Sequence, residues 1–130
     1  MRNVIYVTGI LFVLIGCRNA TAPVQPELGE EIKADFGKEI MISGADVAVE
    51  FVDLVEDSRC PDGVVCVWAG NAQVAIRIND EEAKLNAYLE PKEKVVSKYN
   101  VALISVDPYP QTDIEIPENK YTATIRITKE

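Results

Sequence analysis

A chain of 130 residues is long enough for one small domain with a modest hydrophobic core. Its formal charge of −8, from 21 acidic and 13 basic residues, argues against nucleic-acid binding, which depends on a basic surface that neutralises phosphates. The chain contains no histidine, so it has no general base for a serine or cysteine catalytic triad. We expect no nucleic-acid partner and no cofactor.

The first sixteen residues have the pattern of a secretory signal peptide. Arg2 makes the N-terminus positive, residues 4–15 are almost entirely apolar, and the small residue Gly16 follows. The apolar run is shorter than the roughly 20 residues that a membrane-spanning helix requires. We expect residues 1–16 to be removed, which brings the formal charge from −8 to −9 because Arg2 is the only charged residue among them.

Cys17 follows this signal directly, in the sequence Leu14-Ile15-Gly16-Cys17. The sequence resembles the lipobox of bacterial lipoproteins. The resemblance implies that cleavage occurs before Cys17 and that its sulfur carries diacylglycerol, which anchors the protein to a membrane without crossing it. The alternatives are an ordinary signal peptide with an unmodified cysteine, or an N-terminal membrane helix. No aspartate follows Cys17, so we expect the protein at the outer membrane, facing the periplasm, if the organism is Gram-negative.

Residues 17–31 are predicted to form the lipidated cysteine and a flexible tether, because they contain two prolines and no apolar periodicity. The folded domain then covers residues 32–130. Its two cysteines, Cys60 and Cys66, remain as a pair once Cys17 is assigned to the lipid. In an oxidising compartment such a pair is expected to form a disulfide, which would stabilise the fold by roughly 2 kcal/mol for so short a loop.

The domain sequence alternates apolar and polar residues with a period of two, which predicts β-strands. A change of apolar phase between Phe51 and Asp53 predicts a β-bulge, and the polar residues 79–82 predict a hairpin turn. Residues 90–98 suit a helical turn, a loop or the start of a strand equally. The predicted strands cover residues 36–42, 47–54, 72–79, 83–89, 101–106 and 121–128.

Six to seven short strands predict an all-β fold, most simply an antiparallel β-sandwich with one disulfide-closed loop. A small β-barrel is the alternative. Residues 101–106 are apolar on both faces, which indicates a central strand. Residues 121–128 alternate regularly and are expected to form the closing strand.

The stretch from Asp57 to Asn71 holds the densest group of conformationally constrained residues. Residues 60–63 combine cysteine, proline, aspartate and glycine, which predicts a turn, and residues 64–67 are expected to form a short strand segment. Trp68, the only tryptophan, either covers the disulfide or the edge of the core, as a plug of the core, or is presented to a partner together with Arg59 and Asp62.

A second stiff segment is Asp107-Pro108-Tyr109-Pro110-Gln111, in which two prolines flank a tyrosine. Tyr109 either forms a lid on the core or is an exposed ring. If this segment and the disulfide loop meet at one end of the sandwich, Trp68 and Tyr109 could together stack on a sugar or hold an extended peptide.

The run from residue 57 to residue 72, with residues 107–110 and the alternating closing strand, resembles a group of uncharacterised small bacterial envelope proteins and lipoproteins. These share an arginine-cysteine-proline loop and a tryptophan-alanine-glycine sequence after the second cysteine. The resemblance covers residues 36–129 and implies a β-rich secreted domain. It implies no activity and no catalytic residues.

We therefore expect a lipid-anchored envelope protein without enzymatic activity. It would bind or support an envelope protein or glycan through a surface containing Arg59, Asp62, Trp68 and Tyr109. The alternative is an envelope enzyme or enzyme inhibitor acting on glycan or peptide, although no pair of carboxylates has the pattern of a glycosidase.

Metal binding is not predicted either. A structural zinc site requires four cysteine or histidine ligands, and the chain offers only Cys60 and Cys66 within the domain. Calcium is suited to carboxylates, here Asp53, Glu56, Asp57 and Asp62, but their spacing differs from that of an EF-hand loop.

Replacing Cys17 with serine tests the predicted anchor. The variant should lose lipid and move from the membrane to the soluble fraction, because serine lacks the thiol that carries diacylglycerol. Cell fractionation and metabolic labelling with a radioactive fatty acid measure the two effects. Retention of the unlabelled variant in the membrane fraction would show that the lipoprotein prediction is wrong.

Overall fold

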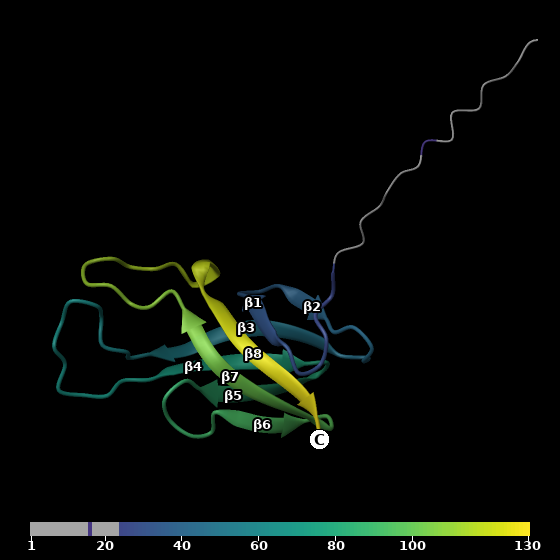
Figure 1. Ribbon diagram of the computed structural model, residues 1–130. Helices are drawn as coiled ribbons and strands as arrows, with labels where there is room; N and C mark the ends of the chain where they lie inside the picture. Colours follow the sequence, from purple (N-terminus) through teal and green to yellow (C-terminus); the bar gives the residue numbers. More distant parts are fainter. Residues whose placement is uncertain (1–15, 17–23) are drawn as a thin grey trace, which may run out of the picture.

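The computed structural model describes Gly16 and residues 24–130 (Figure 1). Residues 1–15 of the predicted signal peptide, Cys17 and the first part of the predicted tether lie outside the described residues. Within those described, the regular structure consists of eight β-strands and one short 3₁₀-helix. None of their helices is long and apolar enough to span a bilayer.

The strands form two antiparallel sheets of four strands each, with orders β1-β8-β7-β6 and β2-β3-β4-β5 (Figure 1). This arrangement confirms the predicted all-β sandwich, although the strand count is eight rather than six to seven, and the sheets do not close into a barrel. The elements are β1 (Glu31–Asp35), β2 (Glu39–Met41), β3 (Ala48–Asp57), β4 (Ala72–Ile78), β5 (Glu81–Asn86), β6 (Glu93–Val96), β7 (Tyr99–Asp107), the 3₁₀-helix η1 (Glu118–Lys120) and β8 (Thr122–Lys129).

The core lies between the two sheets and consists of the alternate apolar residues that the sequence pattern indicated. Val74, Ile76 and Ile78 of β4 are fully buried, as are Ile125 and Ile127 of β8. On the opposite face of β4, Gln73 and Arg77 are partly exposed, whereas the small Ala75 is buried. Because side chains alternate across a strand, one register of pairing buries the whole apolar set at once.

Residues 36–42 do not form the single strand that their alternation predicted. The Phe36 amide donates a hydrogen bond to the Tyr121 carbonyl over 3.1 Å, and the Gly37 amide donates to the Phe51 carbonyl over 2.8 Å. Tyr121 directly precedes β8 of one sheet and Phe51 belongs to β3 of the other, so the chain passes from one sheet to the other at residues 36–37. Gly37 has a φ of +73°, which glycine adopts without steric cost.

The folded domain begins earlier than predicted, because residues assigned to the tether are bonded to it. The Ser43 amide donates to the Pro26 carbonyl over 2.8 Å, and the Gly29 amide donates to the Ile127 carbonyl over 2.7 Å. Glu31 pairs with Arg126 at the start of β1. These are backbone contacts, so the polar composition of this segment gave no signal of them.

Several local predictions are confirmed. The register of β3 against β4 shifts between Phe51 and Asp53, as the change of apolar phase indicated, and shifts again between Leu54 and Glu56. β4 and β5 form the expected hairpin, whose turn consists of Asn79 and Asp80 alone. The ambiguous residues 90–98 contain strand β6, and β7 lies between β6 and β8 as a central strand.

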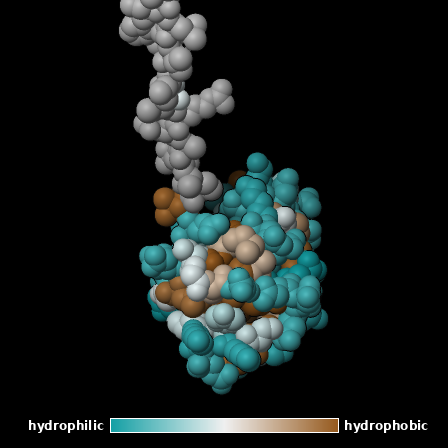
Figure 2. Space-filling view, turned by 90° about the vertical axis from the view of Figure 1, so that its right-hand side faces the viewer, coloured by the Kyte–Doolittle hydropathy of each residue, from teal (hydrophilic) through white to brown (hydrophobic). Residues whose placement is uncertain are grey.

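The two ends of the sandwich differ. The segment at residues 26–27 lies beside the turn between β2 and β3, since Glu27 pairs with Ser43. We call this the tether end; Figure 2 faces it and shows apolar residues within a hydrophilic surround. An open hollow there is lined by residues that include Met41, Ile42 and Ala45. β3 is ten residues long, about 33 Å at the usual rise per residue, and leads from the tether end to the opposite end of the sandwich. We call this opposite end, where β3 and β7 end, the loop end.

Candidate binding surface

Two long connections meet at the loop end (Figure 1). The disulfide loop, residues 58–71, joins β3 to β4, and the proline loop, residues 108–121, joins β7 to β8. The Asp62 amide donates a hydrogen bond to the Pro110 carbonyl over 3.1 Å, and the Thr112 hydroxyl donates to the Asp62 carbonyl over 3.1 Å. The two stiff segments singled out in the sequence therefore form one continuous surface.

Cys60 and Cys66 form the predicted disulfide, with their Cα atoms 5.8 Å apart. The turn that it closes is completed by the Val64 amide, which donates to the Pro61 carbonyl over 3.3 Å. Gly63 has a φ of +81° in this turn. The predicted strand segment at residues 64–67 is wrong: no strand forms there, because the chain at this point protrudes beyond both sheets and meets no strand to pair with.

Arg59 lies at the base of both loops and is only 4% exposed. Its Nε and Nη2 atoms each donate to one oxygen of the Asp57 carboxylate over 2.8 Å. Nη1 donates to the Val106 carbonyl over 2.6 Å, and Nη2 also donates to the Pro108 carbonyl over 3.1 Å. The guanidinium thus connects the end of β3 to the end of β7 through charge-assisted bonds.

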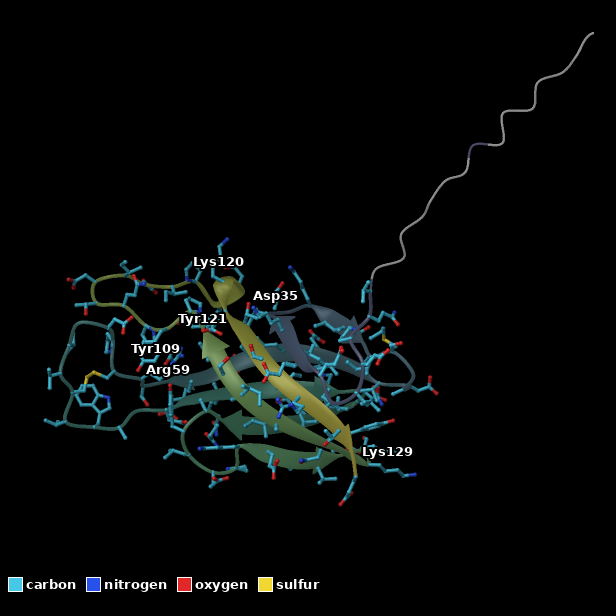
Figure 3. All side chains as sticks on the ribbon, viewed as in Figure 1. Asp35, Arg59, Tyr109, Lys120, Tyr121 and Lys129 are labelled. Atoms are coloured by element: carbon cyan, nitrogen blue, oxygen red, sulfur yellow. A yellow bond between two sulfur atoms is a disulfide. The ribbon has the colours of Figure 1, made fainter. Side chains whose placement is uncertain are left out.

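Two tyrosines complete the environment of this ion pair. The Tyr109 ring lies over the guanidinium, with its centroid 5.0 Å from the Cζ atom, and the Tyr121 hydroxyl donates to Asp57 Oδ2 over 3.4 Å. Figure 3 shows Arg59, Tyr109 and Tyr121 grouped where the loops leave the sheets. The arrangement combines a bidentate ion pair with a cation–π contact.

The ionisation of these groups reflects their packing. Burial lowers the pKa of the Arg59 guanidinium, but the hydrogen bonds and negative charge of Asp57 outweigh it and raise the net pKa above its usual value. Burial raises the pKa of the Tyr121 phenol, and the Asp57 charge raises it further. The Arg59 guanidinium therefore stays positively charged, and Tyr121 protonated, throughout the physiological range.

The burial of Arg59 corrects its predicted place among exposed binding residues. The guanidinium is hydrogen-bonded inside the domain, so Arg59 supports the two loops. Its only contribution to a binding surface is to the lining of a pocket at the loop end. The sequence contains a short signal for this role: Arg59 follows Asp57, the last residue of β3, by two positions, and in extended backbone this spacing directs both side chains to one face.

Trp68 does not fill the core, which excludes the interpretation of this residue as a core plug. The residue is 57% exposed, and its indole N–H donates to the Ser58 carbonyl over 2.9 Å. The adjacent Gly70 lies so close to this strand end that an added Cβ atom would be 2.5 Å from the Ser58 oxygen. The close approach holds the two stems of the disulfide loop together.

A pair of buried asparagines, which sequence reasoning missed, positions the neighbouring β5–β6 connection. Asn71 Nδ2 donates to Asn86 Oδ1 over 2.8 Å, and the Tyr88 amide donates to Asn71 Oδ1 over 3.3 Å. Neither asparagine stands out in the sequence, because asparagine is common in surface turns. Only the packing of β4 on β5 shows that both are buried.

The exposed part of the surface is apolar and acidic. Val65 is 99% exposed and Val67 is 100% exposed. We call these two residues, with the exposed Val64, Trp68 and Ile114, the apolar tip. Asp62 is exposed beside it, as predicted. Among the described residues, no three cysteine or carboxylate side chains lie close enough to hold a metal ion.

Comparison of this chain with protein-family models, with curated protein sequences and with solved structures found no match. The candidate surface therefore rests on the geometry described above.

Replacing Arg59 with methionine should leave the largely buried Asp57 carboxylate without its partner. We expect the free energy of unfolding to fall by about 3–5 kcal/mol, the usual effect of breaking a buried ion pair. Urea denaturation followed by tryptophan fluorescence measures it. The control is Arg126→Met, which breaks the exposed pair with Glu31 and should cost at most about 1 kcal/mol. Equal losses in the two variants would contradict the structural role of Arg59.

Replacing Gly70 with alanine should destabilise the domain by about 2 kcal/mol or more, because backbone atoms of Ser58 and Arg59 occupy the space of the new Cβ atom. Gly44 is the matched control: its φ of +75° is close to the +71° of Gly70, but no atom lies within 4 Å of its added Cβ. Gly44→Ala should therefore cost only about 1 kcal/mol for the backbone conformation. Thermal unfolding of both variants separates the contact from the φ effect.

Proposed function

We propose that this protein is a lipid-anchored, non-enzymatic binding protein of the bacterial cell envelope, and that its apolar tip docks on another envelope protein. The observation that supports the proposal is the exposure of the tip. Val65 and Val67 are almost completely accessible to solvent, on a loop closed by a disulfide. Burying one large apolar side chain contributes about 1.5–3 kcal/mol, so several together supply a substantial docking energy.

The rigidity of the tip favours binding. The disulfide, the hydrogen bonds at Asp62 and the ion pair at Arg59 fix the loop before any partner arrives. Association then costs less conformational entropy than it would with a flexible loop. A loop built for solubility alone would not need apolar side chains held in this way.

The charge around the tip indicates the chemistry of the partner. Asp57 and Arg59 neutralise each other. The remaining charged residues in segments 56–71 and 107–120 are acidic except Lys120, and they are Glu56, Asp62, Asp107, Asp113, Glu115 and Glu118. An apolar surface with an acidic rim is complementary to an apolar pocket with a basic rim.

The position of the tip is consistent with an anchored protein. The described N-terminal segment joins the domain at the tether end, about 33 Å of strand β3 away from the disulfide loop. A lipid on Cys17 would therefore be attached through the end of the domain opposite the apolar tip, which leaves the tip open to a partner. The rigid protruding loop would suit an inhibitor of an envelope enzyme as a special case of the same docking.

Site-specific photo-crosslinking in the native organism tests the proposal. A photoreactive amino acid at Val65 or at Val67 should give one discrete protein adduct, identified by mass spectrometry, and the same residue at the exposed Val95 of β6 should give none. Val67→Asp should weaken binding of the identified partner by about tenfold or more, because it places a charge in an apolar contact. Absence of adducts at both tip positions, or identical adducts at Val95, would reject docking at the tip.

A further inference from the structure

A second feature of the loop end is a pocket that lies apart from the apolar tip. Its volume is about 160 Å³, the space of roughly five water molecules. It lies between the connection that follows β5 and the outer end of β7. The residues of its lining that carry its chemistry are Arg59, Tyr88, Ile104, Ser105, Asp107 and Tyr109.

Two tyrosines from different loops contribute to the lining of the pocket. Tyr88 is 53% exposed and comes from the β5–β6 connection, where the buried Asn71 holds its amide. Tyr109 is 37% exposed and comes from the proline loop, where it packs on the Arg59 guanidinium. Ile104 adds a partly exposed aliphatic side chain to the lining. The Tyr109 ring is held by the Arg59 guanidinium and the backbone of Tyr88 by Asn71, so the pocket exists without a ligand.

The polar groups of the pocket include donors and acceptors. The Ser105 hydroxyl lies 3.3 Å from Asp107 Oδ2, and the exposed Asp107 forms no ion pair with any described residue. A guanidinium has five N–H groups. The bonds to Asp57, Val106 and Pro108 use four of them, so one N–H on Nη1 has no partner among the described residues.

We propose that this pocket binds one pyranose ring of a neutral saccharide. A pyranose has an apolar C–H face that packs on an aromatic ring and a rim of hydroxyl groups that both donate and accept hydrogen bonds. The hydroxyls can donate to the Asp107 carboxylate and accept from Arg59. The size of the pocket limits it to a single ring with its substituents.

The charge of the lining disfavours an anionic ligand, because it would enter beside the unpaired Asp107 carboxylate in a partly enclosed space, where repulsion is stronger than in water. The charge of Arg59 is balanced by Asp57, so it does not repel a cation. An ammonium group, however, only donates hydrogen bonds, whereas a saccharide hydroxyl can donate to Asp107 and also accept from Arg59. The proposal does not depend on the protein docking proposed above, since the pocket and the apolar tip use different residues.

Protein-observed NMR on the full-length chain in detergent tests the proposal. The probes are the tetrasaccharides of glucose in α-1,4 and β-1,4 linkage, of mannose and of N-acetylglucosamine, with sorbitol and tetralysine for comparison. We expect at least one tetrasaccharide to bind with a Kd below about 10 mM and to shift amide signals near residues 59, 88 and 104–109. Failure of all four at that concentration, or binding of tetralysine alone, would overturn the proposal.

Variants distinguish the pocket from other surfaces. Tyr88→Ala should weaken binding of the active saccharide about tenfold or more, whereas Tyr88→Phe keeps the ring and should change the Kd by less than about threefold. Asp107→Asn keeps the shape of the side chain but weakens its acceptor strength, and should also reduce affinity. Val67→Asp alters the apolar tip and should leave saccharide binding unchanged. An unchanged Kd in Tyr88→Ala would place the saccharide elsewhere and overturn the proposal.

Discussion

The ion pair between Arg59 and Asp57 is the interaction on which the loop end depends. It is bidentate and largely buried, and the same guanidinium bonds carbonyl groups at the end of the opposite sheet. Asp57 ends β3 and Val106 lies near the end of β7, so one side chain ties the two sheets together where the long loops begin. The Tyr109 ring above it and the Tyr121 hydroxyl beside it are positioned by the same contact.

A buried ion pair adds little net stability to a domain, because the free energy lost in removing two charges from water offsets much of their attraction. Its advantage is directional: a guanidinium requires acceptors in its own plane, whereas an apolar side chain tolerates many orientations. At the loop end this selects one arrangement of the two loops. The disulfide then fixes the shape of the outer part, and the close contact at Gly70 fixes its stem. The valines of the apolar tip, which contact no core residues, are thereby held exposed to solvent.

The elements that the sequence predicted well are those governed by local alternation. The β4–β5 hairpin, the bulge after Phe51 and the strand at residues 122–129 follow from apolar residues that repeat every second position, and this pattern fixes which face is buried. Prediction failed where backbone bonds between distant residues decide the structure. Residues 26–31 join the sheets through such bonds, and the change of sheet at Phe36 leaves the alternation of its neighbours undisturbed.

By itself, the sequence determined the class of fold, the pairing of Cys60 with Cys66 and the two segments that form the candidate surface, because each depends on residue type, count or short-range spacing. Only the tertiary structure decided which side chains of those segments face inward. Arg59 is buried and Trp68 is largely exposed, the reverse of what hydropathy favours. The reason is that the burial of a loop residue depends on acceptors and neighbours far away in the chain, here Val106 and Pro108. Such partners leave no periodic trace in the residues around Arg59.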